Sequence, residues 1–139
     1  MMTGKAPESF TTQVRMSEFG TDEYSVLQLV YPGAITAHSL QTIGMQIDRN
    51  ASILCSKGAV YIDDFQHAEK MLIKPNGGEE RTLEFPFEYN GFEYEIREVS
   101  HCIAAGKATS DRYLPKDSLA VLRTMDDIRR AWHMEFSFE

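Results

Sequence analysis

The first half of the chain alternates between apolar and polar positions, a pattern that predicts consecutive β-strands. From Phe10 to Met16 every second side chain contrasts with its neighbours, which places the two sets on opposite faces of a sheet. Pro32-Gly33 and Lys57-Gly58 predict tight turns between neighbouring strands. The further strands are expected over residues 24–31, 34–46, 52–56, 59–63, 70–74 and 81–85.

After Asn90-Gly91 the period changes to that of a helix. Apolar residues there recur every third or fourth position, which predicts one apolar stripe made of Phe92, Ile96, Val99 and Ile103. Gly106 is expected to end this helix, and Pro115 is expected to begin a second one at its first position. The apolar positions of the second helix are Leu119, Leu122, Met125, Ile128 and Trp132.

Strands followed by two helices, without strand-helix alternation, indicate an α+β fold. We expect one large, mostly antiparallel sheet with the helices packed on one face, in a single domain over residues 1–139. Because the strands carry apolar residues on both sides, the face without helices is expected to be available for dimerisation. A homodimer is therefore predicted, and its candidate interface residues are Leu27, Leu29, Tyr31, His38 and Leu40.

The amino-acid composition argues against two classes of binding partner, nucleic acids and membranes. Of the 139 residues 42% are hydrophobic and 25% are charged, as in ordinary globular domains, and the formal net charge is -7. Without a basic patch we expect no nucleic-acid partner, and without a long apolar run we expect no membrane association. Cys55 and Cys102 are the two cysteines and form no CxxC pair, so a reducing cytoplasm is the expected compartment.

Few side chains suggest chemistry of their own. Asp63, Asp64 and His67 have the donor types of a divalent-metal site, but a third firmly placed ligand is missing, so we predict no metal. A small metal hydrolase remains a third interpretation. Cys102 follows His101, and adjacent residues of a helix point about 100 degrees apart, so they cannot act as a nucleophile pair. No catalytic residue is predicted.

Several short motifs resemble, in order and spacing, the carboxy-terminal domain of the glucose-fructose oxidoreductase and inositol dehydrogenase superfamily (Gfo/Idh/MocA). The specific pieces lie in the last third of the chain, and the ending Glu135–Glu139 resembles the aromatic tail of the dihydrodiol-dehydrogenase-like branch. The matching segments are residues 4–7, 19–23, 32–34, 57–62, 91–96, 101–103, 106–107, 114–115, 117–119 and 127–129.

The resemblance implies a two-domain enzyme whose amino-terminal Rossmann domain binds NAD or NADP. That domain is absent here: no G-x-G-x-x-G occurs, and the family's Glu-Lys-Pro motif has only a superficial echo in Lys74-Pro75. We therefore expect no cofactor-binding residue in this chain. We expect a substrate-binding and oligomerisation domain for a sugar, polyol or dihydrodiol-like substrate, not catalytically competent alone, with Tyr94 facing the substrate. The alternative is a free-standing dimeric binding or scaffold protein derived from the same domain.

Overall fold

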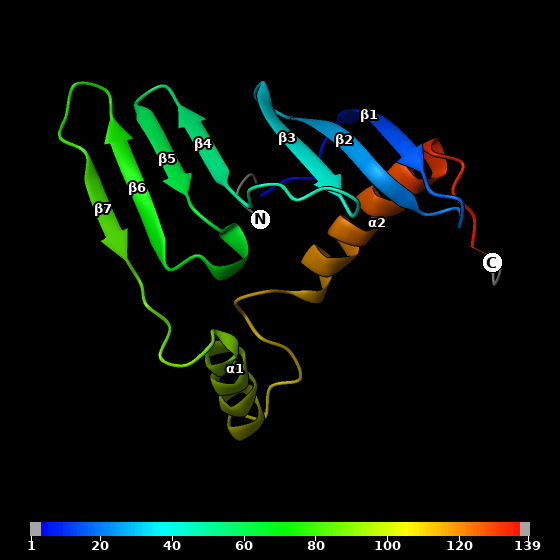
Figure 1. The fold of residues 1–139 in the computed structure, drawn as a ribbon. Helices are drawn as coiled ribbons and strands as arrows, with labels where there is room; N and C mark the ends of the chain where they lie inside the picture. The colour runs from blue at the N-terminus through cyan, green and yellow to red at the C-terminus, as the bar shows by residue number, and fades with distance from the viewer. Residues whose placement is uncertain (1–3, 137–139) are drawn as a thin grey trace. The chain divides into compact units, whose positions relative to one another are not determined.

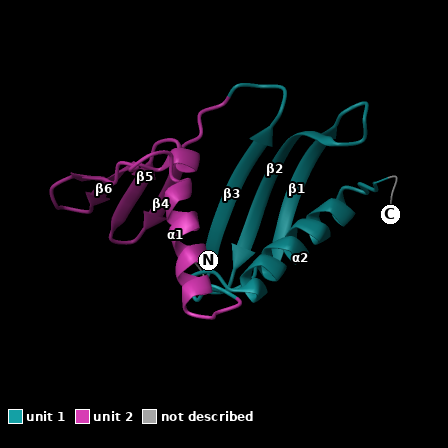
Figure 2. Ribbon diagram, turned by 90° about the horizontal axis from the view of Figure 1, so that it is seen from below, with its two compact units in different colours: residues 1–46, 109–139 teal, residues 47–108 magenta. Residues whose placement is uncertain are grey.

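The computed structural model describes residues 4–136, and it divides the chain into two compact units. The first unit comprises residues up to Gln46 together with those from Thr109 onward, and the second comprises Ile47–Ala108 (Figure 2). Ser137–Glu139, the last residues of the aromatic tail, lie outside the described residues. Neither helix within residues 4–136 has the length and apolar composition that crossing a membrane requires.

The first unit is a three-stranded antiparallel sheet with one helix on one of its faces (Figures 1 and 2). The strand order is β1-β2-β3, and the bounds are β1 Ser9–Met16, β2 Asp22–Tyr31, β3 Ile35–Thr42 and α2 Pro115–Ala131. Just after α2, the Trp132 Nε1–H donates a hydrogen bond of 3.0 Å to Thr12 Oγ1. The Thr12 hydroxyl in turn donates to the Val26 carbonyl over 2.9 Å. These bonds identify the face that carries Thr12 as the face that α2 covers.

The second unit is a four-stranded antiparallel sheet in the order β4-β5-β6-β7. Its elements are β4 Ala51–Cys55, β5 Gly58–Ile62, the 3₁₀ turn η1 Phe65–His67, β6 Lys70–Pro75, β7 Arg81–Glu84 and α1 Phe92–Ala104. Gly58 begins β5 at a φ of +149°, and a Cβ there would lie 2.3 Å from the Lys74 carbonyl oxygen. Only glycine permits this close approach of β5 to β6.

The α+β fold with antiparallel strands is confirmed, and so are the hairpin turns at Gly33 and Gly58. The strands are divided between two sheets, where one large sheet was expected. The strand expected over residues 34–46 ends at Thr42, so that Ile43 and Met45 lie beyond it. Whether the chain is a single domain stays a prediction.

Both helices begin and end close to where the sequence predicts, but their apolar stripes are not buried. The amide of Lys107 donates to the Cys102 carbonyl (2.9 Å) around Gly106, which has a φ of +66°, and Pro115 is the first residue of α2. In α1 the buried residue is Cys102 and in α2 it is Ile128. The interpretation of Phe92 as a core residue is wrong, because its side chain is 63% exposed. The exposed apolar residues of the two stripes are Phe92, Ile96, Val99, Ile103, Leu119, Leu122 and Met125.

A carboxylate of the chain closes the amino terminus of α1. Glu93 accepts hydrogen bonds from the backbone N–H groups of Tyr89 (3.0 Å), Asn90 (3.2 Å) and Gly91 (2.8 Å). Partial desolvation of Glu93 opposes ionisation, but these donors outweigh it and lower the pKa of Glu93 from 4.5 to about 2. The ionised side chain thereby fixes the turn that leads into α1.

Replacing Glu93 by Gln is expected to remove a pH-dependent part of the stability of this unit. Because the folded-state pKa is depressed, the contribution of Glu93 is fully present above pH 4.5 and is lost as the pH falls towards 2. The free energy of unfolding of E93Q should therefore fall less steeply than that of the wild type over this window. Urea titrations followed by circular dichroism at several pH values measure this. E95Q is the matched control, and equal slopes for E93Q and wild type would contradict the assignment.

Candidate functional site: an aromatic surface at the start of α1

Five aromatic residues fall within ten positions at the entry to α1. This aromatic segment runs from Phe85 to Tyr94, and most of its rings face solvent: Tyr89 is 83% exposed, Phe92 63%, Phe85 52% and Tyr94 45%. Large apolar side chains are seldom gathered on the surface without a binding partner. The segment is therefore the strongest candidate for a ligand-facing surface within the described part of the chain.

Tyr94, predicted to face the substrate, is fixed by its neighbours on two sides. Its ring centroid lies 6.3 Å from that of Phe87, at an interplanar angle of 59°. The guanidinium carbon of Arg97 lies 6.0 Å from the centroid of the same ring, within the range of a cation–π interaction. A Cβ on Gly91 would meet the Phe87 ring at 3.3 Å, so the glycine at this position permits Phe87 to pack closely. The Tyr94 ring is thus held in place while nearly half of it stays exposed.

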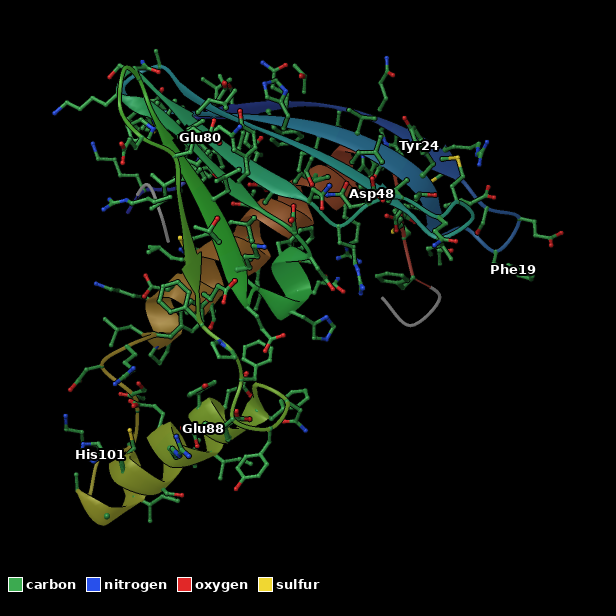
Figure 3. The ribbon with its side chains drawn as sticks, turned by 60° about the vertical axis from the view of Figure 1, so that its left-hand side comes forward. Phe19, Tyr24, Asp48, Glu80, Glu88 and His101 are labelled. Carbon is green, nitrogen blue, oxygen red and sulfur yellow. The ribbon has the colours of Figure 1, made fainter. Side chains whose placement is uncertain are left out.

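An ion pair between Glu88 and Arg97 joins the aromatic segment to α1. Glu88 lies beside α1 (Figure 3). The two terminal guanidinium nitrogens of Arg97 donate to its two carboxylate oxygens, one of them over 2.7 Å. The hydrogen bond from Arg97 lowers the pKa of Glu88, and the bond to Glu88 raises the pKa of Arg97. Both side chains are about half exposed, so this bidentate pair serves to orient the segment more than to stabilise the fold.

Glu69 connects the aromatic segment to the turn between β5 and β6. The Phe85 amide donates to the Glu69 backbone carbonyl, and the Phe87 amide donates to Glu69 Oε1, each over 2.7 Å. The Glu69 amide donates to the carbonyl of His67 over 2.8 Å. Glu69 therefore links the turn η1 to the start of the aromatic segment through hydrogen bonds.

At that turn the structure brings together Asp64 and His67, but with an arginine as the third member. Asp64 Oδ2 accepts from Arg49 Nη2 (3.0 Å) and lies 3.2 Å from His67 Nδ1. Asp63 forms no part of this set, and residues 4–136 contain no group of three side chains suited to a metal ion. Within that range the metal-hydrolase interpretation has no structural support.

The remaining histidine and cysteine side chains considered for catalysis do not form one cluster. His38 lies on β3 and His101 in α1, and these belong to different units. Cys102 is buried, with its Sγ 3.7 Å from Glu98 Oε1. Neither the register nor the hydrogen bonds among the described residues assemble these three into a catalytic group.

The five candidate interface residues do not share one face of the sheet. In the β1-β2-β3 register Thr12 pairs with Leu27, so Leu27, Leu29 and Tyr31 point to the face that α2 covers. His38 and Leu40 pair with Gln28 and Val26 and point to the opposite face. The helix-free face therefore carries a different set: Ser9, Thr11, Gln13 and Arg15 on β1, Tyr24, Val26, Gln28 and Val30 on β2, and Thr36, His38, Leu40 and Thr42 on β3.

Each described helix has a carboxylate of the chain at its amino terminus. A pyrophosphate is usually held by free backbone N–H groups at a helix start. Just before α1 the N–H groups of Tyr89, Asn90 and Gly91 donate to the Glu93 carboxylate, and the Phe92 N–H, the first of the helix, donates to Asn90 Oδ1 over 3.2 Å. At α2 the first residue is a proline, and the Leu114 amide donates to Asp117 Oδ2 over 3.2 Å. Each position already holds a negative charge that would repel a phosphate.

A groove is also present in the first unit, with a volume of about 480 Å³. It lies between residues 6–10 and α2, and its charged lining residues are Glu8, Arg123 and Asp127. None of the substrate-facing or interface residues predicted from the sequence lines it. With charges of both signs and Phe10 as its one aromatic ring, it offers a weaker basis for ligand recognition than the aromatic segment.

Sequence reasoning selected Tyr94 as substrate-facing, which stays a prediction, and did not find the residues that hold its ring. Five aromatic residues in ten positions are visible in the sequence and could have indicated the surface. The contributions of Glu69, Glu88 and Arg97 could not have been found in this way, because they depend on contacts between segments up to 18 residues apart.

The sequence relatives found by comparison with known proteins share the same name. No family model matches the chain. The chain is 28% identical over 135 residues to trans-1,2-dihydrobenzene-1,2-diol dehydrogenase of Xenopus tropicalis, covering 91% of this chain and 40% of the relative. It is 26% identical over 143 residues to the protein of the same name from Bos taurus, covering 96% and 42%. The chain thus spans about two fifths of the length of the curated relatives it matches.

A solved structure shares the fold. UDP-N-acetylglucosamine 3-dehydrogenase from Acidithiobacillus ferrooxidans superposes with a TM-score of 0.63 at 12% identity, over 76% of this chain and 34% of that protein. The sequence relatives and the shared fold agree with the motifs found in the last third of the chain. They confirm the resemblance of this chain to the carboxy-terminal domain of the Gfo/Idh/MocA superfamily, nearest its dihydrodiol-dehydrogenase-like branch.

Proposed function

We propose that the chain is the substrate-binding and oligomerisation domain of an NAD(P)-dependent oxidoreductase that acts on a sugar, polyol or dihydrodiol-like substrate. The observation that carries the proposal is the exposed aromatic segment Phe85–Tyr94, braced by Arg97 and Glu88. Exposed ring faces favour the flat or puckered carbon ring of such a ligand, and neighbouring polar groups suit its hydroxyls. The names of the relatives, a ring diol dehydrogenase and a sugar-nucleotide dehydrogenase, support the same substrate class.

Hydride transfer is assigned to a part of the enzyme other than these residues. The aromatic surface is open, so a ligand resting on it would be enclosed by a further protein surface. The filled amino termini of α1 and α2 argue that NAD or NADP is held by a separate Rossmann domain. The matched relatives are about two and a half times as long as the aligned segment, which leaves ample length for such a domain.

Replacing Tyr94 by Leu is expected to weaken binding of a ring diol. The variant keeps an apolar side chain but loses the aromatic face and its contact with Arg97, which should raise the Kd for trans-cyclohexane-1,2-diol roughly threefold or more. This compound is a saturated analogue of the diol in the names of the relatives. Titrations followed by two-dimensional NMR measure the affinity and also report which residues respond.

The matched control is Y113L, the same substitution at a tyrosine that is 52% exposed but lies outside the aromatic segment. Its Kd should equal that of the wild type. The proposal fails if the diol does not bind, or if its spectral changes avoid residues 85–97. Dimerisation without any ring-ligand binding would favour the alternative of a dimeric scaffold protein.

For oligomerisation we propose a homodimer through the helix-free face of the β1-β2-β3 sheet. That face carries Tyr24, Val26, Val30 and Leu40, with Arg15 of β1 beside Tyr24, and the described residues of its own unit provide no helix to cover it. A largely uncharged sheet face suits burial against a second copy of itself. Cys55 and Cys102 form no disulfide with each other, which suits a reducing compartment, and we keep the cytoplasm as part of the proposal.

Leu40→Glu is expected to convert the dimer to a monomer, because two copies of a carboxylate would be brought together in an apolar interface. Light scattering coupled to size exclusion at micromolar concentration measures the mass. Leu54→Glu, which makes the same change at a leucine that is 74% exposed on β4, should leave the mass unchanged. A monomeric wild type, or a dimeric L40E, would rule out this interface.

A further inference from the structure

We propose that His67 is a specificity-determining residue of the aromatic surface, and that its Nε2 atom accepts a hydrogen bond from a hydroxyl of the ring-shaped ligand. This inference rests on the proposed function, since it assigns one polar contact to the same ligand. Its first basis is the position of the histidine. His67 ends the turn η1, and Glu69 ties this turn to Phe85 and Phe87 by the bonds described above.

The second basis is the orientation of the imidazole. A carboxylate has no hydrogen to donate, so the 3.2 Å contact between His67 Nδ1 and Asp64 Oδ2 requires the proton to be on Nδ1. In the neutral ring Nε2 then carries the lone pair and can only accept a hydrogen bond. The side chain of His67 is 59% exposed, which leaves room for a hydroxyl to approach it.

The third basis is that Asp64 is itself held. Arg49 donates from Nη2 to Asp64 Oδ2 and from Nη1 to Gln66 Oε1, each over 3.0 Å. The Phe65 amide donates to the Arg49 carbonyl over 2.8 Å, which anchors the turn through the backbone as well. Asp64 has a φ of 47°, a left-handed conformation that aspartate tolerates better than most residues and that directs its carboxylate back to His67.

Together these contacts fix an oriented acceptor on the turn that Glu69 links to Phe85 and Phe87. Phe65, on the same turn, is 53% exposed and extends the apolar surface beside the histidine. A ligand with an apolar ring and a hydroxyl substituent can satisfy both features, whereas a ring without a hydroxyl can satisfy only one. His67 would therefore select hydroxylated rings, with Asp64 and Arg49 acting as positioning residues.

The first test concerns the tautomer of His67 in the full chain. Long-range ¹H–¹⁵N spectra distinguish a ring protonated on Nδ1 from one protonated on Nε2. Neutral His67 is expected to be protonated on Nδ1, and Asp64→Asn is expected to shift the population towards the Nε2 form, because the carboxylate that holds the proton is lost. A wild-type His67 protonated on Nε2 would overturn the inference, whatever the ligand does.

The second test compares two ring probes by NMR titration. His67→Leu should raise the Kd for trans-cyclohexane-1,2-diol roughly threefold to tenfold, the effect of one lost hydrogen bond, and leave that for cyclohexanone unchanged. His101→Leu is the matched control and should behave as wild type towards both probes. If Y94L weakens diol binding and H67L does not, this inference is wrong and the proposed function stands. If the wild type binds neither probe, both are wrong.

Discussion

Each described helix has a carboxylate of the chain bound to the backbone N–H groups that lead into it. Glu93 accepts from three amides just before α1, and Asp117 accepts from the Leu114 amide just before α2. A helix start is where proteins of the dehydrogenase class hold the phosphates of a dinucleotide, and that use is closed here by like charge. The same bonds define the entry to α1, and with it the position of the aromatic segment. What the chain can bind is thus constrained by how its helices are capped.

The capped entry to α1 and the Glu69 bonds act together on one short stretch of chain. Glu93 fixes the turn at Tyr89–Gly91, and Glu69 fixes the amides of Phe85 and Phe87. Between these attachments the aromatic rings have little freedom to withdraw from the surface. Their exposure is therefore built into the local structure, and a ring ligand would meet a surface that is already organised.

Much of the local structure was predictable from sequence because it depends on short-range rules. The alternation over Phe10–Met16, the turns at Gly33 and Gly58, and the helix limits at Gly106 and Pro115 each follow from backbone preferences of a few residues. The division into two sheets and the exposure of the Phe92–Ile103 stripe could not be read in this way. Periodicity identifies an apolar stripe, but it does not say whether anything in the chain covers that stripe.

The same limit applies to the candidate site. Tyr94 was selected from a motif, and its exposure of 45% is compatible with a role at the surface. Most of the interface residues were chosen because they are apolar, yet the strand register places Leu27 and Leu40 on opposite faces of the sheet. Arg49 and Asp64 are 15 positions apart, and Asp64 itself has a left-handed backbone conformation, so no local sequence pattern predicts their contact.

Our central proposal is that residues 4–136 offer a ligand surface and leave nucleotide binding to another domain. It is tested most directly by isothermal titration calorimetry of the chain with NADH and NADPH. The account predicts no binding at micromolar concentrations, because Glu93 and Asp117 place a negative charge at the amino terminus of each described helix, where a pyrophosphate would bind. Stoichiometric micromolar binding of either nucleotide would contradict it.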